Sequence, residues 1–231
     1  MAKGKLYKLD QIKSMPNVFQ NFNWQYPQLI NHRNEKVDFK GRWSHVFQNN
    51  KPIILELACG YGEYTMTMAE KFPNFNFIGI DIKGNRIYTG AKYVLDKQLD
   101  NAIFVRINIE LLDKIFSQNE IAEIWLPFPD PHNRKVRANR RLTAPRFLEI
   151  YHKILQPDGC IHLKTDSDLL YHYTLDVISE CGHTLLVNYP DIYANNLAPD
   201  DLLKVKTRYE KLNLSGADAI KYLQFKLIGD K

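Results

Sequence analysis

Short apolar runs alternate along this chain with segments of helical periodicity, and this alternation limits the fold more than any other feature of the sequence. The apolar runs cover residues 53–58, 75–80, 102–107, 121–126, 160–163 and 185–189, and the candidate helices cover residues 63–71, 85–99, 143–155 and 168–181. Strands that alternate with helices build a mostly parallel, doubly wound α/β sheet. We therefore predict one such domain over residues 51–231. Residues 220–228 are predicted to form an antiparallel edge strand at its C-terminal end, because no helix follows them.

Residues 1–50 fit this alternation poorly, and we interpret them as an N-terminal extension packed on the domain. Their start is basic, and aromatic residues are spread through the segment: Phe19, Phe22, Trp24, Tyr26 and Trp43. Aromatic side chains most often pack in a core or a lid. The alternative use is a surface on which bases stack.

Composition excludes several classes of protein. The 231 residues carry a net charge of +5, with 45% hydrophobic and 25% charged residues, which excludes intrinsic disorder and low complexity. Cys59, Cys160 and Cys181 form no CxxC pair, and the seven histidines show no metal-ligand spacing, so we expect neither a disulfide framework nor a metal site. We find no signal peptide and no apolar run of membrane-spanning length, and we expect a cytoplasmic protein without a membrane partner.

A glycine-rich turn follows the first predicted strand. Residues 56–62 read ELACGYG and lead directly into a helix, while Asp81 ends the next strand, twenty-one residues after Gly60. Glycines let the backbone approach a ligand, the helix N-terminus offers free N–H groups, and a carboxylate after the second strand can accept both ribose hydroxyls. This order predicts a nucleoside site.

The residues around the turn favour S-adenosylmethionine over a dinucleotide. Thr65 stands where the dinucleotide fingerprint has its third glycine, and Glu56 lies at the end of the strand. A carboxylate there repels a pyrophosphate but attracts the ammonium group of a methionine moiety. We therefore assign Glu56, Gly60, Gly62 and Asp81 to a cofactor site. The alternative is structural, because Gly60 and Gly62 could simply make the turn while Glu56 and Asp81 cap helices. Asn108, after the third strand, could bind an adenine edge or cap a short helix.

A proline-rich loop follows the fourth predicted strand, and a cationic stretch follows the loop. Residues 127–131 read PFPDP, which places Asp130 at the carboxyl edge of the sheet, where doubly wound proteins bind their ligands. Six basic residues and no acidic residue follow: Arg134, Lys135, Arg137, Arg140, Arg141 and Arg146. A solvated charge run is the ordinary explanation, but this position at the mouth of a site favours a nucleic-acid substrate.

Taken together, ELACGYGEY, GIDIKGNR, FPDP with its basic loop, LKTD and a Thr-x-x-Glu near the C-terminus resemble the bacterial tRNA (guanine-N7-)-methyltransferase family. The resemblance implies a Rossmann-like methyltransferase fold, S-adenosyl-L-methionine as methyl donor, and tRNA as partner. We expect a monomer or homodimer. It implies tRNA (guanine(46)-N7)-methyltransferase activity on a variable-loop guanine. It also implies that Glu56, Asp81, Asn108 and Asp130 contact the donor, with Asp130 catalytic, and that Arg134, Asp166, Thr207 and Glu210 contact the RNA.

Some of these positions have other interpretations. Thr207 to Glu210 is also a capping box, and Asp166 could cap the helix that begins near Asp168. The chain departs from the family pattern where His132 and Asn133 replace the usual Trp-Pro after FPDP. The alternative functions are a methyltransferase for another RNA base or a small molecule, and a non-catalytic RNA-binding module.

Overall fold

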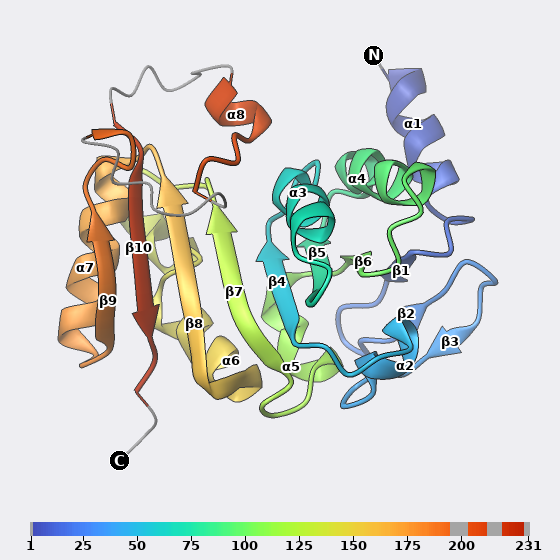
Figure 1. Ribbon diagram of the computed structural model, residues 1–231, viewed down its shortest axis with the longest axis horizontal. Coiled ribbons are helices and arrows are strands. Elements are labelled where there is room, and N and C mark those ends of the chain that lie inside the picture. The colour runs from blue at the N-terminus through green and yellow to red at the C-terminus, as the bar shows by residue number, and fades with distance from the viewer. Residues whose placement is uncertain (1, 195–202, 212–218, 229–231) are drawn as a thin grey trace.

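The structure of the protein is a computed structural model that describes residues 2–194, 203–211 and 219–228. Among these residues, ten strands form one sheet in the order β3-β2-β1-β6-β5-β4-β7-β8-β10-β9 (Figure 1). The strands are β1 (Val18–Asn21), β2 (Leu29–Ile30), β3 (Lys36–Val37), β4 (Ile53–Leu57), β5 (Asn76–Asp81), β6 (Ala102–Arg106), β7 (Ile121–Pro127), β8 (Leu155–Thr165), β9 (Thr184–Tyr189) and β10 (Lys221–Lys226). The helices are α1 (Ala2–Gln11), α2 (Trp43–Phe47), α3 (Glu63–Lys71), α4 (Gly84–Asp96), α5 (Leu112–Ile115), α6 (Pro145–Ile154), α7 (Asp168–Glu180) and α8 (Arg208–Lys211), with short 3₁₀ helices η1 (Ile109–Leu111) and η2 (Lys135–Arg140).

The predicted doubly wound sheet is confirmed. Strands β1, β6, β5, β4, β7 and β8 are parallel neighbours, and the sequence order reverses between β4 and β7. The C-terminal strand β10 is antiparallel to β8, as expected, but it lies one position in from the edge because β9 pairs with its other side. In sheets of this kind, ligands bind outside the carboxyl ends of the strands at the point of reversal. The topology therefore places a site beyond β4 and β7.

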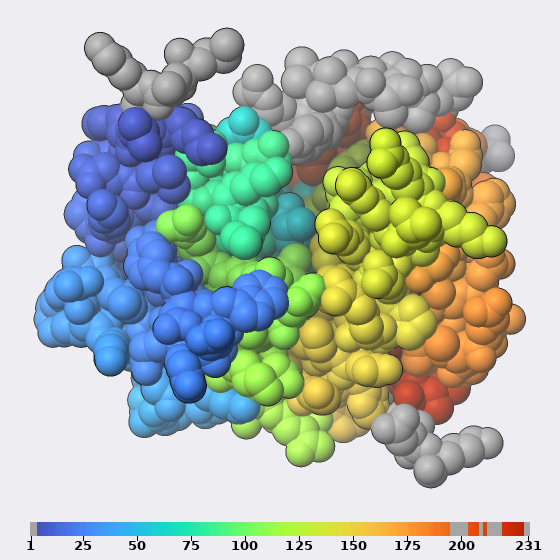
Figure 2. All heavy atoms as spheres, turned by 180° about the vertical axis from the view of Figure 1, so that it is seen from behind, coloured from blue at the N-terminus to red at the C-terminus, as the bar shows by residue number. Residues whose placement is uncertain are grey.

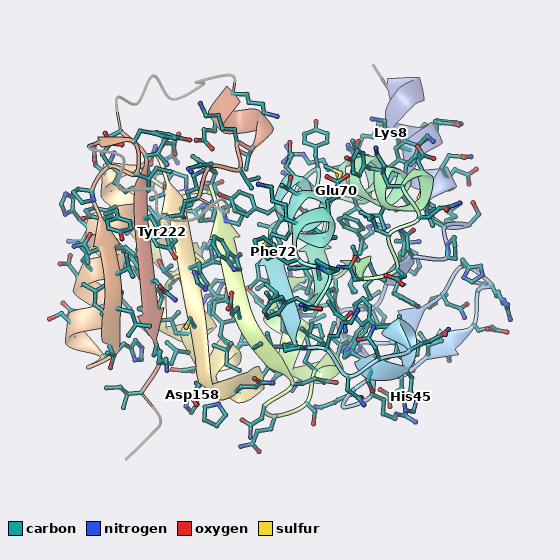
Figure 3. All side chains as sticks on the ribbon, viewed as in Figure 1. Lys8, His45, Glu70, Phe72, Asp158 and Tyr222 are labelled. Atoms are coloured by element: carbon teal, nitrogen blue, oxygen red, sulfur yellow. The ribbon has the colours of Figure 1, made fainter. Side chains whose placement is uncertain are left out.

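Two apolar cores lie on the two faces of the sheet. One contains buried residues of α5, α6 and α7, and the other contains buried residues of α3 and α4 together with Ile12, which follows α1. Helix α1 packs on α4, where the Lys8 ammonium lies 5.5 Å from the centre of the Tyr88 ring (Figure 3). Burial of apolar side chains on both faces is the main stabilising contribution to such a three-layer arrangement.

Local signals explain where the helices begin. Helix α6 has Pro145 in its first turn, where the missing N–H costs nothing. Helix α7 is capped by Ser167, whose hydroxyl accepts a hydrogen bond from the Leu170 N–H at 3.2 Å. The alternative role for Asp166, as the cap of this helix, is therefore wrong. Ser167 caps α7 and leaves the Asp166 side chain for another use.

The N-terminal extension joins the sheet. Strand β1 pairs in parallel with β6, and β2 and β3 continue outward in antiparallel order. The buried Trp43 ring anchors the end of the extension, since its indole N–H donates to the Ile115 carbonyl at 2.9 Å. Strands of two to four residues carry too few alternating positions for periodicity to reveal them.

Within the described ranges, no helix has the length and apolar character needed to cross a membrane. In that same part of the chain, no cluster of three or more histidine, cysteine, aspartate or glutamate side chains could hold a metal ion.

Candidate functional site

The turn after β4 runs through three left-handed backbone positions. Ala58, Gly60 and Gly62 have φ angles of 55°, 57° and 75°. The turn is held to the sheet by the Cys59 N–H, which donates to the Ile80 carbonyl at 3.0 Å. Left-handed geometry is strained for a residue with a side chain, so Ala58 is held in it by its surroundings. Gly60 and Gly62 adopt this geometry without strain, so Ala58 is the strained residue of the turn, and such strain at a strand end is typical of a ligand-binding turn.

Glu56 lies at the base of this turn and is almost fully buried. One of its carboxylate oxygens, Oε2, accepts hydrogen bonds from the Thr65 N–H at 2.7 Å and from the Thr65 hydroxyl at 2.6 Å. Burial raises the pKa of Glu56 to about 8, and the Thr65 hydrogen bonds only partly oppose this shift. Thr65 is the third residue of α3, so Glu56 caps that helix. Glu56 therefore has the capping role that the sequence offered as an alternative to cofactor binding. A buried acid with a raised pKa at a strand end is also a marker of a binding site.

Asp81 ends β5 and closes the same turn. Its Oδ2 accepts from the Gly60 N–H at 2.9 Å and its Oδ1 from the Lys83 N–H at 2.7 Å, so the carboxylate joins the ends of β4 and β5. A cavity of about 140 Å³ opens beside it. The cavity is lined by Ala58, Asp81, Ile82, Ile107, Asn108, Ile109, Leu142 and Phe147. Apolar walls with two polar groups suit a purine ring of a nucleoside.

Asn108 serves two purposes. Its Oδ1 accepts from the Glu110 N–H at 3.0 Å and caps η1, which confirms the capping interpretation. Asn108 also lines the cavity beside Asp81. An amide has one acceptor with two lone pairs and two N–H donors, so capping leaves hydrogen-bonding capacity for a ligand.

The two glycines of the turn differ in what surrounds them. A Cβ at Gly60 would meet only the Ala58 carbonyl oxygen, at 4.0 Å, so the space beside Gly60 is open. A Cβ at Gly62 would lie 2.5 Å from the Phe104 ring. A Cβ at Gly79 or at Gly90 would lie 2.6 or 2.5 Å from the same ring. Gly62 is therefore required for packing of α3 against β6, while Gly60 leaves room for a ligand.

This difference predicts opposite effects of alanine at the two positions. Gly62→Ala should destabilise the protein by about 2 to 4 kcal/mol, because overpacking against Phe104 adds to left-handed strain. Gly60→Ala should lower the unfolding free energy by only about 1 kcal/mol while weakening donor binding. Urea denaturation and ligand titration of both variants measure the two effects. Equal stability losses would contradict the assignment.

The proline-rich loop after β7 presents Asp130 to solvent. The Phe128 N–H donates to the Lys164 carbonyl at 2.7 Å, and Phe128 and His132 both have left-handed backbone, with φ angles of 53° and 44°. Asp130 Oδ1 accepts from the His132 N–H at 2.9 Å, and the side chain is 73% exposed. The loop is thus fixed by backbone turns and hydrogen bonds while the carboxylate stays accessible.

The basic stretch beyond Asp130 divides into internal and exposed cations. Arg141 is buried, donates to the Pro131 and His132 carbonyls, and lies 4.3 Å from the Tyr173 ring centre. Arg146 pairs with Glu110 at 2.8 Å. The cations left exposed on η2 and its N-cap are Arg134, Lys135, Arg137 and Arg140. Arg146 is exposed as well but is held in its ion pair, so five of the six predicted cations are exposed and four of them lie on η2 or its N-cap.

The buried side chain of Lys164 binds residues 203–210, which we call the C-terminal segment. The Lys164 ammonium donates to the carbonyls of Leu203 and Val205 at 2.8 and 2.9 Å and pairs with Glu210 Oε2 at 2.9 Å. Both side chains of the pair are almost inaccessible, at 0% and 5% exposure. Tyr193 also donates its hydroxyl to Glu210. Burial lowers the pKa of Lys164, and the Glu210 carboxylate opposes that shift.

The Thr207 hydroxyl accepts from the Glu210 N–H at 3.3 Å, which is the first of the two hydrogen bonds of the predicted capping box. Lys164 also lies 5.5 Å from the centre of the Phe128 ring and 5.7 Å from that of Tyr64. Its side chain therefore contacts the C-terminal segment, the proline-rich loop and α3. Lys164 lies inside the LKTD motif but was not among the predicted site residues, because nothing in sequence separates a buried lysine from a surface one.

The predicted residues thus gather at one edge of the sheet. Glu56, Asp81, Asn108 and Asp130 lie at or just beyond the carboxyl ends of β4, β5, β6 and β7, and Asp166 follows β8. Figure 2 shows the yellow-green loop after β7 on one side of a hollow in this face of the molecule. A larger cavity of about 690 Å³ lies elsewhere, beside α6 and the end of β10, and it contains no predicted site residue.

Comparisons with known proteins show the family to which the chain belongs. A family model described as "Putative methyltransferase" matches residues 50–223. The chain is 41% identical over 227 residues to a tRNA (guanine-N(7)-)-methyltransferase of Christiangramia forsetii, covering 98% of this chain and 99% of that protein. It is 43% identical over 228 residues to the protein of the same name from Bacteroides fragilis, covering 98% and 87% of the two chains.

Solved structures share the fold at low sequence identity. A 30S ribosomal A1408 methyltransferase from an uncultured bacterium has a TM-score of 0.58 and 16% identity, covering 84% of this chain and 96% of that one. A variant of the 16S rRNA (adenine(1408)-N(1))-methyltransferase of Catenulisporales acidiphilia, solved with its cosubstrate SAM, has a TM-score of 0.59 and 14% identity, covering 85% and 95%. At these identities the likeness shows the fold alone.

Proposed function

Because the chain belongs to the tRNA (guanine-N7-)-methyltransferase family, we propose that it transfers a methyl group from S-adenosyl-L-methionine to N7 of a guanine in tRNA. The observation that supports this assignment is an accessible carboxylate, Asp130, which lies at the same edge of the sheet as the cavity beside Asp81 and is followed in sequence by four exposed cations. We further propose that the target is the variable-loop guanine at position 46, as the family resemblance implies, and that the reaction takes place in the cytoplasm.

The residues of the turn fit S-adenosylmethionine, which supplies an electrophilic methyl group on a sulfonium. Asp81 and Asn108 border the cavity that suits its adenosine, and Gly60 leaves open space for close approach. Glu56, once ionised, would face the cationic methionine end. The chain thus provides a largely apolar cavity for the base and carboxylates for the ribose and the cationic part of the donor.

Guanine N7 carries a lone pair and no proton, so methyl transfer to it needs no general base. What the protein supplies is position and charge. Asp130 stabilises the positive charge that develops on the purine. Asp166 and Glu210 accept from the guanine N1–H and amino group. Glu210 already accepts from Lys164 and Tyr193 and is 5% exposed, so its contact with the guanine requires the segment of residues 203–211 to open.

The test is incubation of the protein with labelled S-adenosylmethionine and bulk tRNA, followed by digestion to nucleosides. We expect the label in 7-methylguanosine. Label in another nucleoside, or in a small molecule of a cell extract, would indicate a methyltransferase of different specificity. Binding of tRNA without any transfer of label would indicate an RNA-binding module. Sequencing of the modified tRNA then identifies the methylated position.

The raised pKa of Glu56 predicts that donor affinity depends on pH. Below pH 8 the free protein holds Glu56 protonated, with a pKa of about 8, and a cationic ligand favours the ionised form. Binding therefore releases a proton, and affinity should rise as pH increases from about 6 to 8, by up to about tenfold per unit, and then level off. Titration calorimetry in buffers of different ionisation enthalpy measures the released proton.

Glu56→Gln is the control, since glutamine keeps an acceptor for Thr65 but cannot ionise. This variant should bind S-adenosylmethionine weakly and without proton release. A pH dependence that persists in Glu56→Gln would show that another group is responsible.

The exposed cations predict a salt-dependent contact with phosphates. Replacing Arg134, Lys135 and Arg137 together with alanine should weaken tRNA binding and lower the slope of log K against log salt by about 2 to 3, since each phosphate contact contributes about 0.7 to 0.9. Folding should be unaffected because all three side chains are exposed. A filter-binding series in 50 to 300 mM salt gives both values, and an unchanged slope would exclude phosphate contacts at these positions.

A further inference from the structure

The loop between β1 and β2, residues 22–28, exposes three aromatic rings. Phe22, Trp24 and Tyr26 are 60%, 51% and 75% exposed. The other two tryptophans of the chain, Trp43 and Trp125, are buried. Aromatic side chains that serve in packing are usually buried. Three exposed rings within five residues are instead typical of a binding surface. We call residues 22–28 the aromatic loop.

The aromatic loop is built by two asparagines. Asn21 Oδ1 accepts from the Asn23 and Gln28 N–H groups, and Asn23 Oδ1 accepts from the Gln25 and Tyr26 N–H groups, at 2.9 to 3.3 Å. These bonds satisfy the backbone of the loop from within, as in Asx turns. The three rings therefore remain exposed although the backbone of the loop is held in one shape, which lowers the entropy lost on binding.

The aromatic loop lies at the same edge of the sheet as the candidate site. Strand β1 runs parallel to β6 with Gln20 opposite Arg106, so the loop begins where β6 ends, two residues before Asn108. The Arg106 side chain donates to the Ile82 carbonyl at 3.2 Å and lies 5.5 Å from the centre of the Phe22 ring. One arginine thus joins the loop to the segment that follows Asp81.

Figure 2 shows the blue segment that contains the aromatic loop on the same face as the yellow-green loop after β7, across the central hollow. An RNA that delivers a guanine to Asp130 and its phosphates to the exposed cations therefore lies over this face. The aromatic loop and the loop that carries those cations thus border the same face of the molecule.

The charge around the aromatic loop suits an RNA. Residues 22–28 contain no acidic side chain. Arg106 lies beside Phe22, and Lys36 lines a cavity of about 510 Å³ together with Phe22 and Tyr26. Single-stranded RNA is bound by this combination of exposed rings for the bases and nearby cations for the backbone.

We propose that the aromatic loop is a base-stacking site for unpaired nucleotides of the tRNA that flank the target guanine. The proposal rests on the proposed function, because it takes tRNA as the substrate. Extruding a guanine from its stack exposes the faces of its neighbours, and rings at the edge of the site can replace the lost stacking. The N-terminal extension then contributes directly to substrate binding.

Tryptophan fluorescence tests this contact, because Trp24 is the exposed tryptophan. Titration with tRNA should quench its emission, and the quenching should disappear in Trp24→Phe, which keeps a stacking ring and should bind tRNA within about twofold of the unmodified protein. Trp24→Ala together with Tyr26→Ala should weaken tRNA binding by about tenfold or more, since loss of one stacked base costs about 5-fold to 150-fold. The affinity for S-adenosylmethionine and the salt slope should not change.

Tyr7→Ala is the matched control, because Tyr7 is also exposed but lies on α1, which packs against α4. It should bind tRNA normally. If Trp24→Ala with Tyr26→Ala binds and methylates tRNA as the unmodified protein does, the stacking proposal is wrong while the proposed function stands. A change of oligomeric state in that variant, measured by sedimentation, with unchanged tRNA affinity would instead make the aromatic loop a contact between copies of the chain. If the unmodified protein yields no 7-methylguanosine, the proposed function itself fails.

Discussion

Asp130→Ala should reduce methyl transfer by at least about a hundredfold to a thousandfold while leaving tRNA affinity nearly unchanged. The expected size is that of losing one preorganised electrostatic group beside a developing charge. Asp130 is 73% exposed, so its removal should change the unfolding free energy by less than about 0.5 kcal/mol. Single-turnover rates with saturating tRNA, together with direct binding, separate the two effects.

Asp130→Asn distinguishes charge from loop geometry. The Asp130 side chain accepts from the His132 N–H and so supports a left-handed residue in the loop. Asparagine keeps that acceptor but removes the charge, and it should lose activity almost as fully as alanine. If Asp130→Asn retained full activity, the carboxylate would only shape the loop, and the electrostatic role would be excluded.

Lys164→Met should have the largest effect on stability among the single changes considered. Methionine fills similar space but leaves Glu210 buried without its cation and removes the donors to the Leu203 and Val205 carbonyls. Leaving one charge of a buried pair unpaired costs about 3 to 5 kcal/mol. The loss can be smaller if the segment from Leu203 to Glu210 opens instead, because Glu210 then reaches water. In either case the KM for tRNA should rise more than the Kd for S-adenosylmethionine.

Two measurements separate these outcomes. Urea denaturation reports the global loss, and hydrogen exchange of residues 203–211 reports local opening. Lys164→Met combined with Glu210→Gln should recover part of the stability lost in the single variant, because no unpaired charge then remains. No recovery in the double variant would show that the ion pair is unimportant compared with the carbonyl contacts.

Periodicity was sufficient for the central sheet because β4, β5 and β6 are buried on both faces almost throughout and read as continuous apolar runs. Strands β7 and β8 are buried in the same way only in their later parts, Ile124–Pro127 and Ile161–Thr165. The helix Glu63–Lys71 matches the predicted range, as its start is marked by the preceding glycines. The strands of the N-terminal extension were not predicted, since Leu29–Ile30 and Lys36–Val37 are too short to show alternation. They join the sheet only through β1, which pairs with β6 more than sixty residues further along the chain.

The placement of candidate-site residues was predictable where the pattern marks a strand end, as for Glu56 and Asp81. Which cations are exposed was not predictable. Arg141 and Arg134 belong to the same basic stretch, yet Arg141 is buried beneath the loop and Arg134 is in solvent. The pairing of Lys164 with Glu210 was also hidden, because it joins residues 46 positions apart through a tertiary contact.

The pairing of β1 with β6 has a consequence for how the sheet ends. Without residues 18–37, β6 would be an outer strand, and its Ala102–Arg106 backbone would offer unpaired N–H and C=O groups from an almost wholly apolar segment. Such an edge recruits strands of other molecules and promotes aggregation. The extension moves the boundary outward to β3, which has two residues and an exposed lysine, Lys36. A short, charged edge strand of this kind protects the sheet from pairing with other molecules. A shortened protein that begins at residue 51 should therefore be prone to self-association, even though it retains every residue of the donor site.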